Sequence, residues 1–125
     1  MADLLHFELV SPERLLSSGK VAMVVVPGAE GDFGVLPGHA PVMSTIRPGA
    51  IAIYEADSNT LTRRIFVDGG FAEVTPEGLT ILAESATPVS DIDPAKVATD
   101  LAAARTAGNE MAIARLEAMQ AAVVN

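Results

Sequence analysis

The chain has 125 residues, half of them hydrophobic, and carries 8 basic against 16 acidic side chains for a formal charge of −8. A chain of this length forms one domain or two small ones with a substantial core, and its negative charge argues against nucleic acid as a partner. It has no cysteine and only two histidines, which argues against disulfides and against a metal centre. No stretch approaches the ~20 apolar residues of a membrane-spanning helix, and the first residues carry no positive cluster typical of a secretory signal. We therefore expect any membrane association to depend on a partner.

The first two thirds of the chain have the pattern of short β-strands. Leu5, Phe7 and Leu9 alternate with polar residues, which is the period of a half-buried strand. The next apolar run is continuous and mostly β-branched, which favours a buried strand at residues 21–26. Five further runs bounded by turn residues are predicted as strands at residues 42–46, 50–55, 61–67, 70–74 and 79–83. Short strands at spacings of about 8 to 12 residues indicate an all-β sandwich or barrel.

Residues 27–42 read PGAEGDFGVLPGHAPV and interrupt the strand pattern. Three Pro-Gly pairs, beginning at Pro27, Pro37 and Pro48, are turn signals. Proline sets the first central position of a turn, and glycine accepts the positive φ that a type II turn needs at the second. Between the first two pairs, glycines flank an acidic and an aromatic side chain, Asp32 and Phe33. We predict a long, glycine-rich surface loop here, which serves either as a connector or as a binding surface.

Residues 90–125 have the pattern of a helical hairpin. Asp93 followed by Pro94 is a strong helix start, because the aspartate can accept a bond from a free backbone amide and proline at the first position loses none. Apolar and small residues then recur at spacings of three and four on both sides of Gly108 and Asn109, which predicts two antiparallel helices. The helices carry few large apolar side chains, so we expect them to be stable only when docked on the β domain or on a partner.

The predicted fold class is therefore α+β by content. It consists of an N-terminal all-β sandwich at residues 1–89, followed by a C-terminal antiparallel two-helix hairpin at residues 90–125. Because the hairpin has so little apolar surface of its own, we expect it to be the mobile part of the chain.

The motif at residues 27–42 is followed by IRPGAIAIY and then by VDGGFAEVTPEGLTILAE. These three motifs, in this order and spacing, resemble the epsilon subunit of bacterial F-type ATP synthases. The similarity covers roughly residues 5–90 and includes the Gly69-Gly70 pair and Glu73-Val74. The helical tail stands where the family has one, but it matches by pattern more than by residue.

This resemblance implies a non-catalytic subunit of the central stalk, and thus not an enzyme. Family members belong to the rotor, bind the gamma subunit and the ring of c subunits, and couple proton transport to ATP synthesis. Their tail can reach the catalytic alpha and beta subunits as a regulator. The resemblance also implies a peripheral membrane protein at the cytoplasmic face of the bacterial inner membrane. It places the interface with the c-ring and gamma at Glu30, Gly31, Asp32, Phe33 and His39, with Asp32 at the family's acidic contact position.

In some bacterial relatives the hairpin binds ATP, and the resemblance locates the corresponding residues at Ile92, Asp93, Lys96 and Arg115. Lys96 replaces an arginine of the family motif and lacks its planar fork, and Thr87 stands in place of a glutamate. We therefore expect ATP binding by the tail to be weak or absent, with Asp93 serving as a helix cap, and no other cofactor. Arg115 is the one basic residue of the second helix, so we expect the tail to inhibit ATP hydrolysis weakly or not at all.

Two other classes of function remain open from the residues alone. A stand-alone β-sandwich module that binds a small ligand would have the same composition, and it would bind no rotor subunit. An enzyme could use His39 and Asp32 as an acid–base pair, although no nucleophile stands beside them in the sequence. Loss of turnover on His39→Ala substitution would identify such an enzyme.

Overall fold

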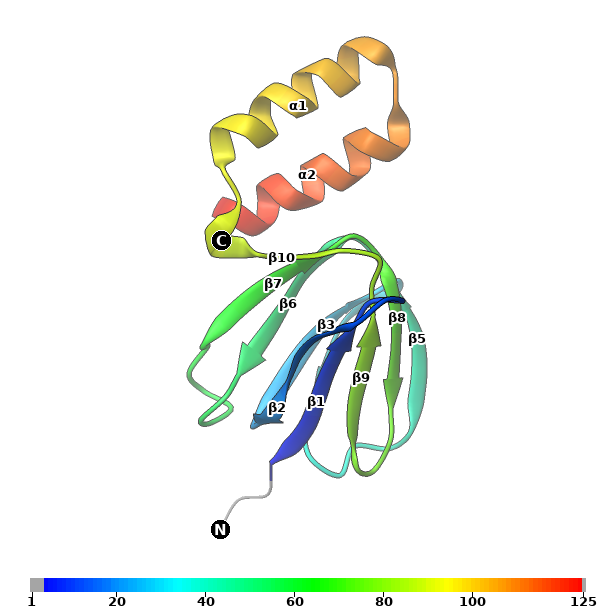
Figure 1. Ribbon diagram of the computed structural model, residues 1–125, viewed down its shortest axis with the longest axis vertical. Coiled ribbons are helices and arrows are strands. Elements are labelled where there is room, and N and C mark those ends of the chain that lie inside the picture. The colour runs from blue at the N-terminus through cyan, green and yellow to red at the C-terminus, as the bar shows by residue number, and fades with distance from the viewer. Residues whose placement is uncertain (1–3, 125) are drawn as a thin grey trace.

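The computed structural model describes residues 4–124. They form a β-sandwich and a helical hairpin that lies at the end of the sandwich opposite the start of β1 (Figure 1). The strands are β1 (Leu5–Val10), β2 (Leu15–Val21), β3 (Met23–Gly28), β4 (Gly31–Val35), β5 (Val42–Ile46), β6 (Gly49–Tyr54), β7 (Arg63–Val67), β8 (Gly70–Val74), β9 (Gly78–Leu82) and β10 (Ala86–Pro88). They are followed by the 3₁₀ turn η1 (Val89–Asp91) and by helices α1 (Pro94–Ala107) and α2 (Glu110–Val124). None of the helices described between residues 4 and 124 is long and apolar enough to cross a membrane.

Ten strands form one hydrogen-bonded sheet that divides into two five-stranded halves. The first half has the order β4-β3-β6-β7-β10, and the second has the order β5-β8-β9-β1-β2. Neighbouring strands are antiparallel except for β1 and β9, which run parallel. The halves are joined where Gly28 of β3 pairs with Ile46 of β5. Their inner faces enclose the core, as expected for a sandwich.

The join between the two halves is a corner of the chain at residues 47–49. β3 pairs with β6 at Val25 and with β5 at Gly28, so β5 and β6 act as one long partner strand with a bend between them. Pro48 occupies this bend. Proline has no backbone N–H to donate, and at the bend no ladder hydrogen bond is lost. A Cβ added to Gly49 would lie 3.1 Å from the Cβ of Pro27, which explains the small residue after the proline.

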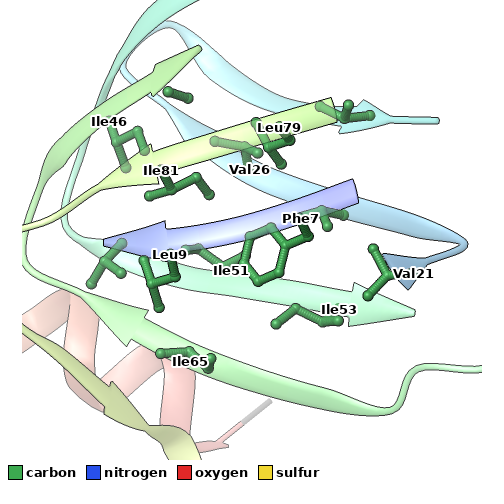
Figure 2. Close-up of a cluster of buried hydrophobic side chains, with 14 of the residues drawn as sticks. Phe7, Leu9, Val21, Val26, Ile46, Ile51, Ile53, Ile65, Leu79 and Ile81 are labelled. Carbon is green, nitrogen blue, oxygen red and sulfur yellow. The ribbon is translucent and has the colours of Figure 1, made fainter. Parts of the chain in front are cut away.

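Alternate residues of the strands build the core, as the period-2 pattern predicts. Phe7 and Leu9 of β1 point into the same cluster as Ile51 and Ile53 of β6 (Figure 2). Each of these four side chains is at most 1% exposed. Phe7 is the largest member of the cluster, so its replacement by alanine should cost about 3 to 5 kcal/mol.

Two strands lie in segments that the sequence pattern leaves unassigned. β2 has the sequence LLSSGKV, which contains two serines, a glycine and a lysine and so lacks a strong strand signal. Its register is set instead by six pairs with β1, from Leu5 with Val21 to Val10 with Leu15. β10 is only three residues long and pairs with β7. Both strands therefore depend on a ladder with a neighbouring strand rather than on their own composition.

The prediction of a long surface loop at residues 27–42 is wrong. Pro27 and Gly28 end β3 and pair with Asp32 and Gly31 of β4, because a two-residue connection suffices to form a tight hairpin. Of the three Pro-Gly pairs, the second forms the expected turn. Gly38 has a φ of 77°, and the His39 amide donates to the Leu36 carbonyl at 3.1 Å.

The hairpin begins and turns as the sequence predicts. The Asp93 carboxylate accepts a hydrogen bond from the Ala95 amide at 3.0 Å, and Pro94 is the first residue of α1. Gly108 ends α1 in the left-handed region at a φ of 69°, and Asn109 accepts from the Ala112 amide at the start of α2. The two helices meet through a small buried cluster formed by Val97, Leu101, Ala104 and Leu116.

Candidate interaction site

The turn between β3 and β4 carries most of the predicted interface residues. Gly28 pairs with Gly31 at the ends of the two strands, so Ala29 and Glu30 form a two-residue tip. Gly31 has a φ of 144°, a conformation that strains any residue with a side chain. Glu30 and Asp32 are both exposed. The turn is therefore a compact acidic projection of the sandwich rather than an irregular loop.

Arg47 holds this turn in place, and the sequence analysis did not identify it. Its side chain donates to the Gly28 carbonyl at 2.5 Å and to Asp32 Oδ1 at 2.5 Å. Its backbone amide donates to the Pro27 carbonyl at 3.0 Å. One residue of the corner thus fixes both strands of the β3–β4 hairpin. The guanidinium fork makes this possible, because it can donate along two directions at once.

Phe33 packs between the β3–β4 turn and the core of the sandwich. It pairs with Val26 and packs, half-buried, against the edge of the core. A Cβ added to Gly28 would lie 2.9 Å from the Phe33 ring, so glycine is required there to admit the ring. An open groove of about 440 Å³ lies beside it, lined by the turn and by β5. The ring contributes to folding and forms one wall of this groove.

His39 lies at the other end of the sandwich. β4 runs away from the Gly28–Gly31 turn to Val35, and residues 36–41 then cross to Val42, the end of β5 distant from Ile46. There the His39 ring lies close to its neighbour, with Nδ1 2.6 Å from the Ala40 carbonyl. The structure therefore does not bring His39 together with Asp32. An acid–base pair of these two residues has no geometric basis.

A second exposed feature is a row of apolar side chains across the outer face of β8, β9, β1 and β2. Phe71 pairs with Leu82, Leu82 with Val10, and Val10 with Leu15, so the four side chains are successive neighbours across the strands. Phe71, Leu82 and Leu15 are 37%, 46% and 53% exposed. Exposed apolar side chains that lie side by side, unlike isolated ones, often mark an interaction site. The sequence could have indicated this row, because its apolar residues stand at positions of the strand pattern that point away from the core.

The hairpin is docked on the outer face of β6 through α2. Ala118, Ala121 and Ala122 of α2 line a groove of about 340 Å³ together with residues of β3, β6 and the corner. The small side chains allow close approach of the helix to the sheet but bury little area. These alanines lie on a different side of α2 from Leu116, which faces α1. α2 therefore has two packing faces, of which the sequence analysis identified one.

Phe66 is covered on this same outer face. Its strand neighbours Ile65 and Val67 point into the sandwich core, so Phe66 points outwards, yet it is only 2% exposed. β7 contacts η1, and α2 contacts both β6 and η1. η1 and α2 are therefore the elements positioned to cover Phe66.

The four residues considered for ATP binding do meet in one pocket of about 230 Å³ between η1, α1 and α2, namely Ile92, Asp93, Lys96 and Arg115. Asp91 and Asp100 line the same pocket, so acidic groups outnumber basic ones. Lys96 is bonded to Asp100 at 3.1 Å, and Arg115 Nε donates to Asp68 Oδ2 at 2.7 Å. Both cations are thus already paired with carboxylates of the chain, so we expect the pocket to bind a phosphate group poorly.

The β-sandwich is also identified by comparison with known proteins. A family model described as the ATP synthase delta/epsilon chain, beta-sandwich domain, matches residues 4–89. The chain belongs to this family. The ATP synthase epsilon chain of Maricaulis maris is 57% identical over 132 aligned residues, which cover 97% of each chain. The epsilon chain of Rhodospirillum centenum is 64% identical over 93 residues, covering 74% of this chain and 62% of the relative.

Solved structures of ATP synthase assemblies contain chains with the complete fold of this protein. A chain in the cryo-EM structure of the Euglena gracilis mitochondrial ATP synthase OSCP/F1/c-ring superposes with a TM-score of 0.85 at 25% identity, covering 98% of this chain and 82% of that one. A chain of the Tetrahymena thermophila central stalk and c-ring shares the fold with a TM-score of 0.65 at 13% identity. Its curated relatives are ATP synthase epsilon chains, so the chain belongs to a family of stalk subunits that are not catalytic.

Proposed function

We propose that the protein binds the gamma subunit and the c-ring and thereby couples proton flow to ATP synthesis. The observation that carries this proposal is the similarity over 98% of the chain to a component of an F1/c-ring assembly. The epsilon-chain fold presents two separate exposed surfaces, the acidic turn and the apolar row. A subunit that connects two different partners needs two such surfaces on one rigid body.

The apolar row is the surface proposed to bind gamma. Its members are Val10, Leu15, Phe71 and Leu82, and Met43 of β5, 67% exposed, lies on the same outer face. Aromatic residues and methionine are enriched at the centres of protein interfaces. The row crosses four adjacent strands of the second half-sheet, from β8 to the edge strand β2, so it offers a continuous surface to a large partner.

The acidic turn is the surface proposed to bind the c-ring. It projects from the sandwich at the end that carries the hairpin, because Asp32 and Arg47 share a groove with Ala118 and Ala121 of α2. A tip that carries negative charge suits the polar loops of a ring with basic and amide groups. Exposed charges of this kind set orientation and association rate more than affinity.

The hairpin is proposed to be a separate unit, residues 90–125, that regulates the complex weakly. Its buried cluster is distinct from that of the sandwich at residues 1–89, and its candidate cations are paired. Contact with the alpha and beta subunits would require it to leave the sandwich. In this role the protein is a peripheral subunit at the cytoplasmic face of the bacterial inner membrane, held there by the complex.

The test is binding of the full-length chain to recombinant gamma, with two matched leucine substitutions. Leu82→Glu places a charge in the apolar row, and Leu61→Glu places one in the loop before β7, where leucine is equally exposed at 45% against 46%. We expect Leu82→Glu to abolish binding and Leu61→Glu to preserve it. If the wild-type chain binds neither gamma nor a gamma–c-ring complex, the proposed function is wrong.

A further inference from the structure

The edge of the first half-sheet carries a pocket that the proposed function does not use. β10 lies along β7 at this edge and leads towards the hairpin (Figure 1). It pairs with Ile65, Phe66 and Val67 of β7, so Arg63 and Arg64 lie beyond the end of its ladder. A pocket of about 500 Å³ lies at this step, lined by residues 61–65 and by residues 88–90, which include the first two residues of η1.

The pocket has a positive lining in a strongly negative chain. Arg63 and Arg64 both line it, and no carboxylate of residues 4–124 does, although the whole chain has a formal charge of −8. The hydroxyl groups of Thr62 and Ser90 line it as well. The Thr62 hydroxyl oxygen accepts from the Glu55 amide at 3.0 Å, which leaves its hydrogen available as a donor. Every polar side chain of the lining can therefore donate to an anion.

Arg64 is the cation of this pocket that has no partner within the described part of the chain. Arg63 is paired with Glu55 at 3.1 Å, whereas Arg64 forms no ion pair with any residue from 4 to 124. Arg14 and Lys20 share this property, but both are exposed to solvent, and Arg64 is partly buried. A charge that is partly withdrawn from water without a partner is unfavourable, so an anion beside Arg64 would recover part of that cost.

The remaining walls of the pocket are apolar and come from Leu61, Ile65, Pro88 and Val89. The volume of the pocket exceeds that of a bare phosphate or carboxylate group, so a ligand that fills it combines an anionic group with an apolar body. The donors come from three segments, namely β7, the loop before it and η1. This arrangement suits the three terminal oxygens of a phosphate monoester better than the two oxygens of a carboxylate.

We propose that this pocket binds a small organic phosphate monoester, with Arg64 as its main charged contact and the hydroxyls of Thr62 and Ser90 as further donors. The bound ligand bridges β7 to η1, the segment that leads into the hairpin. The site shares no lining residue with the tail pocket of Lys96 and Arg115, and it does not depend on binding to gamma or to the c-ring. The alternative is that the edge charges only prevent pairing with another strand, in which case no ligand binds.

The test is a titration of phenyl phosphate into the isotope-labelled full-length chain, followed by amide chemical shifts. At about pH 7.5 the monoester is mostly a dianion, because its second pKa is near 6. We expect saturable shifts at residues 61–65 and 88–90. Arg64→Gln should weaken binding about tenfold, since a hydrogen bond to a charged group is lost. Arg14→Gln removes the same charge from an exposed site, and Lys96→Gln removes one from the tail pocket, so both should keep wild-type affinity.

Two further ligands distinguish the possible sources of the anion. Inorganic phosphate keeps the anionic group without the apolar body, and benzoate keeps an aromatic body but carries a carboxylate. Both should bind more weakly than phenyl phosphate. Equal affinity for either of them would overturn the assignment of a phosphate monoester.

Three results would overturn the site itself. They are shifts that do not saturate at millimolar concentrations, shifts centred on the tail pocket, and equal weakening by Arg64→Gln and Arg14→Gln, which would indicate a general attraction by surface charge. If the spectrum of Arg64→Gln shows an unfolded chain, Ser90→Ala replaces it. Loss of this hydroxyl should weaken binding about threefold, and wild-type affinity of Ser90→Ala would then refute the proposal. Binding to gamma is a separate measurement, and its failure would refute only the proposed function.

Discussion

Replacing Arg115 with glutamine should shift the hairpin away from the sandwich. Among residues 4–124, the Arg115–Asp68 pair is the only ion pair that joins the two parts of the chain. It links the middle of α2 to the turn between β7 and β8, 47 residues away in sequence. The remaining docking contacts are made by alanines and by the covering of Phe66.

The size of the effect follows from the exposure of the pair. The Arg115 and Asp68 side chains are 40% and 31% exposed, so solvent screens the pair and its value lies in the range of exposed ion pairs, about 0.2 to 1 kcal/mol. This corresponds to a change of up to about fivefold in the ratio of docked to undocked hairpin. Burial of the alanine methyl groups contributes roughly 0.8 kcal/mol each. The ion pair is therefore comparable to the burial of a single alanine methyl group of the interface.

A distance measurement between two spin labels tests this prediction directly. The chain contains no cysteine, so cysteines introduced at Ser58 in the sandwich and at Met111 in α2 are the only sites labelled. Both positions are exposed, and Met111 lies at the start of α2. We expect Arg115→Gln to enlarge the population with a changed distance, and 1 M salt to do the same in the wild-type chain, because salt screens the pair.

Arg105→Gln provides the matched control. Arg105 forms an ion pair with Glu117 at 3.0 Å, compared with 2.7 Å for Arg115 and Asp68, but both of its residues belong to the hairpin. Its loss should leave the distance distribution of the labels unchanged. An unchanged distribution in Arg115→Gln, or an equal shift in both variants, would refute the idea that the pair to Asp68 holds the hairpin.

Four further predictions concern the hairpin and the sandwich. Deleting residues 94–125 should leave ATP hydrolysis by the complex nearly unchanged, and a several-fold rise would contradict weak inhibition. Millimolar ATP should not raise the melting temperature of the isolated chain, whereas a ligand at a hundred times its dissociation constant would add about 2.7 kcal/mol. In hydrogen exchange, amides of α1 and α2 should exchange faster than those of the central strands, and equal protection would show that the hairpin is as stable as the sandwich. Gly78→Ala should lower the free energy of unfolding in urea by about 2 to 3 kcal/mol, because the added Cβ would lie 2.2 Å from the His6 carbonyl oxygen. Gly19→Ala is the control: its Cβ would have nothing within 4 Å, so the free energy of unfolding should fall by less than about 0.5 kcal/mol.

Local chemistry made the hairpin predictable. The Asp93 cap, Pro94 at the first helical position and the left-handed Gly108 are all observed, because each depends on neighbours within four residues. The strands with strong apolar patterns were predictable for the same reason. β2 was not predictable, because the segment LLSSGKV forms a strand through its hydrogen bonds with β1. The composition of a segment does not show which strand it will pair with.

The contacts that organise the candidate site were beyond the reach of sequence patterns. Asp32 and Arg47 are 15 residues apart, and Asp68 and Arg115 are 47 apart. Each pair forms only because the sheet turns a corner or because α2 docks on the sandwich. The family resemblance located Asp32 but assigned it to a partner, whereas its ion pair within the chain is visible only once β3, β4 and the corner are assembled.

Arg115 connects the two expectations for the tail. It was considered as a phosphate ligand, and it lines the pocket with Ile92, Asp93 and Lys96, but its guanidinium is bonded to Asp68. An anion that entered this pocket would have to compete with the Asp68 carboxylate for the same cation. Binding of an anion to Arg115 and docking of the hairpin on the sandwich therefore oppose each other by the linkage of the two equilibria. The ion pair between Arg115 and Asp68 is therefore a reason to expect that any nucleotide site in the tail is weak.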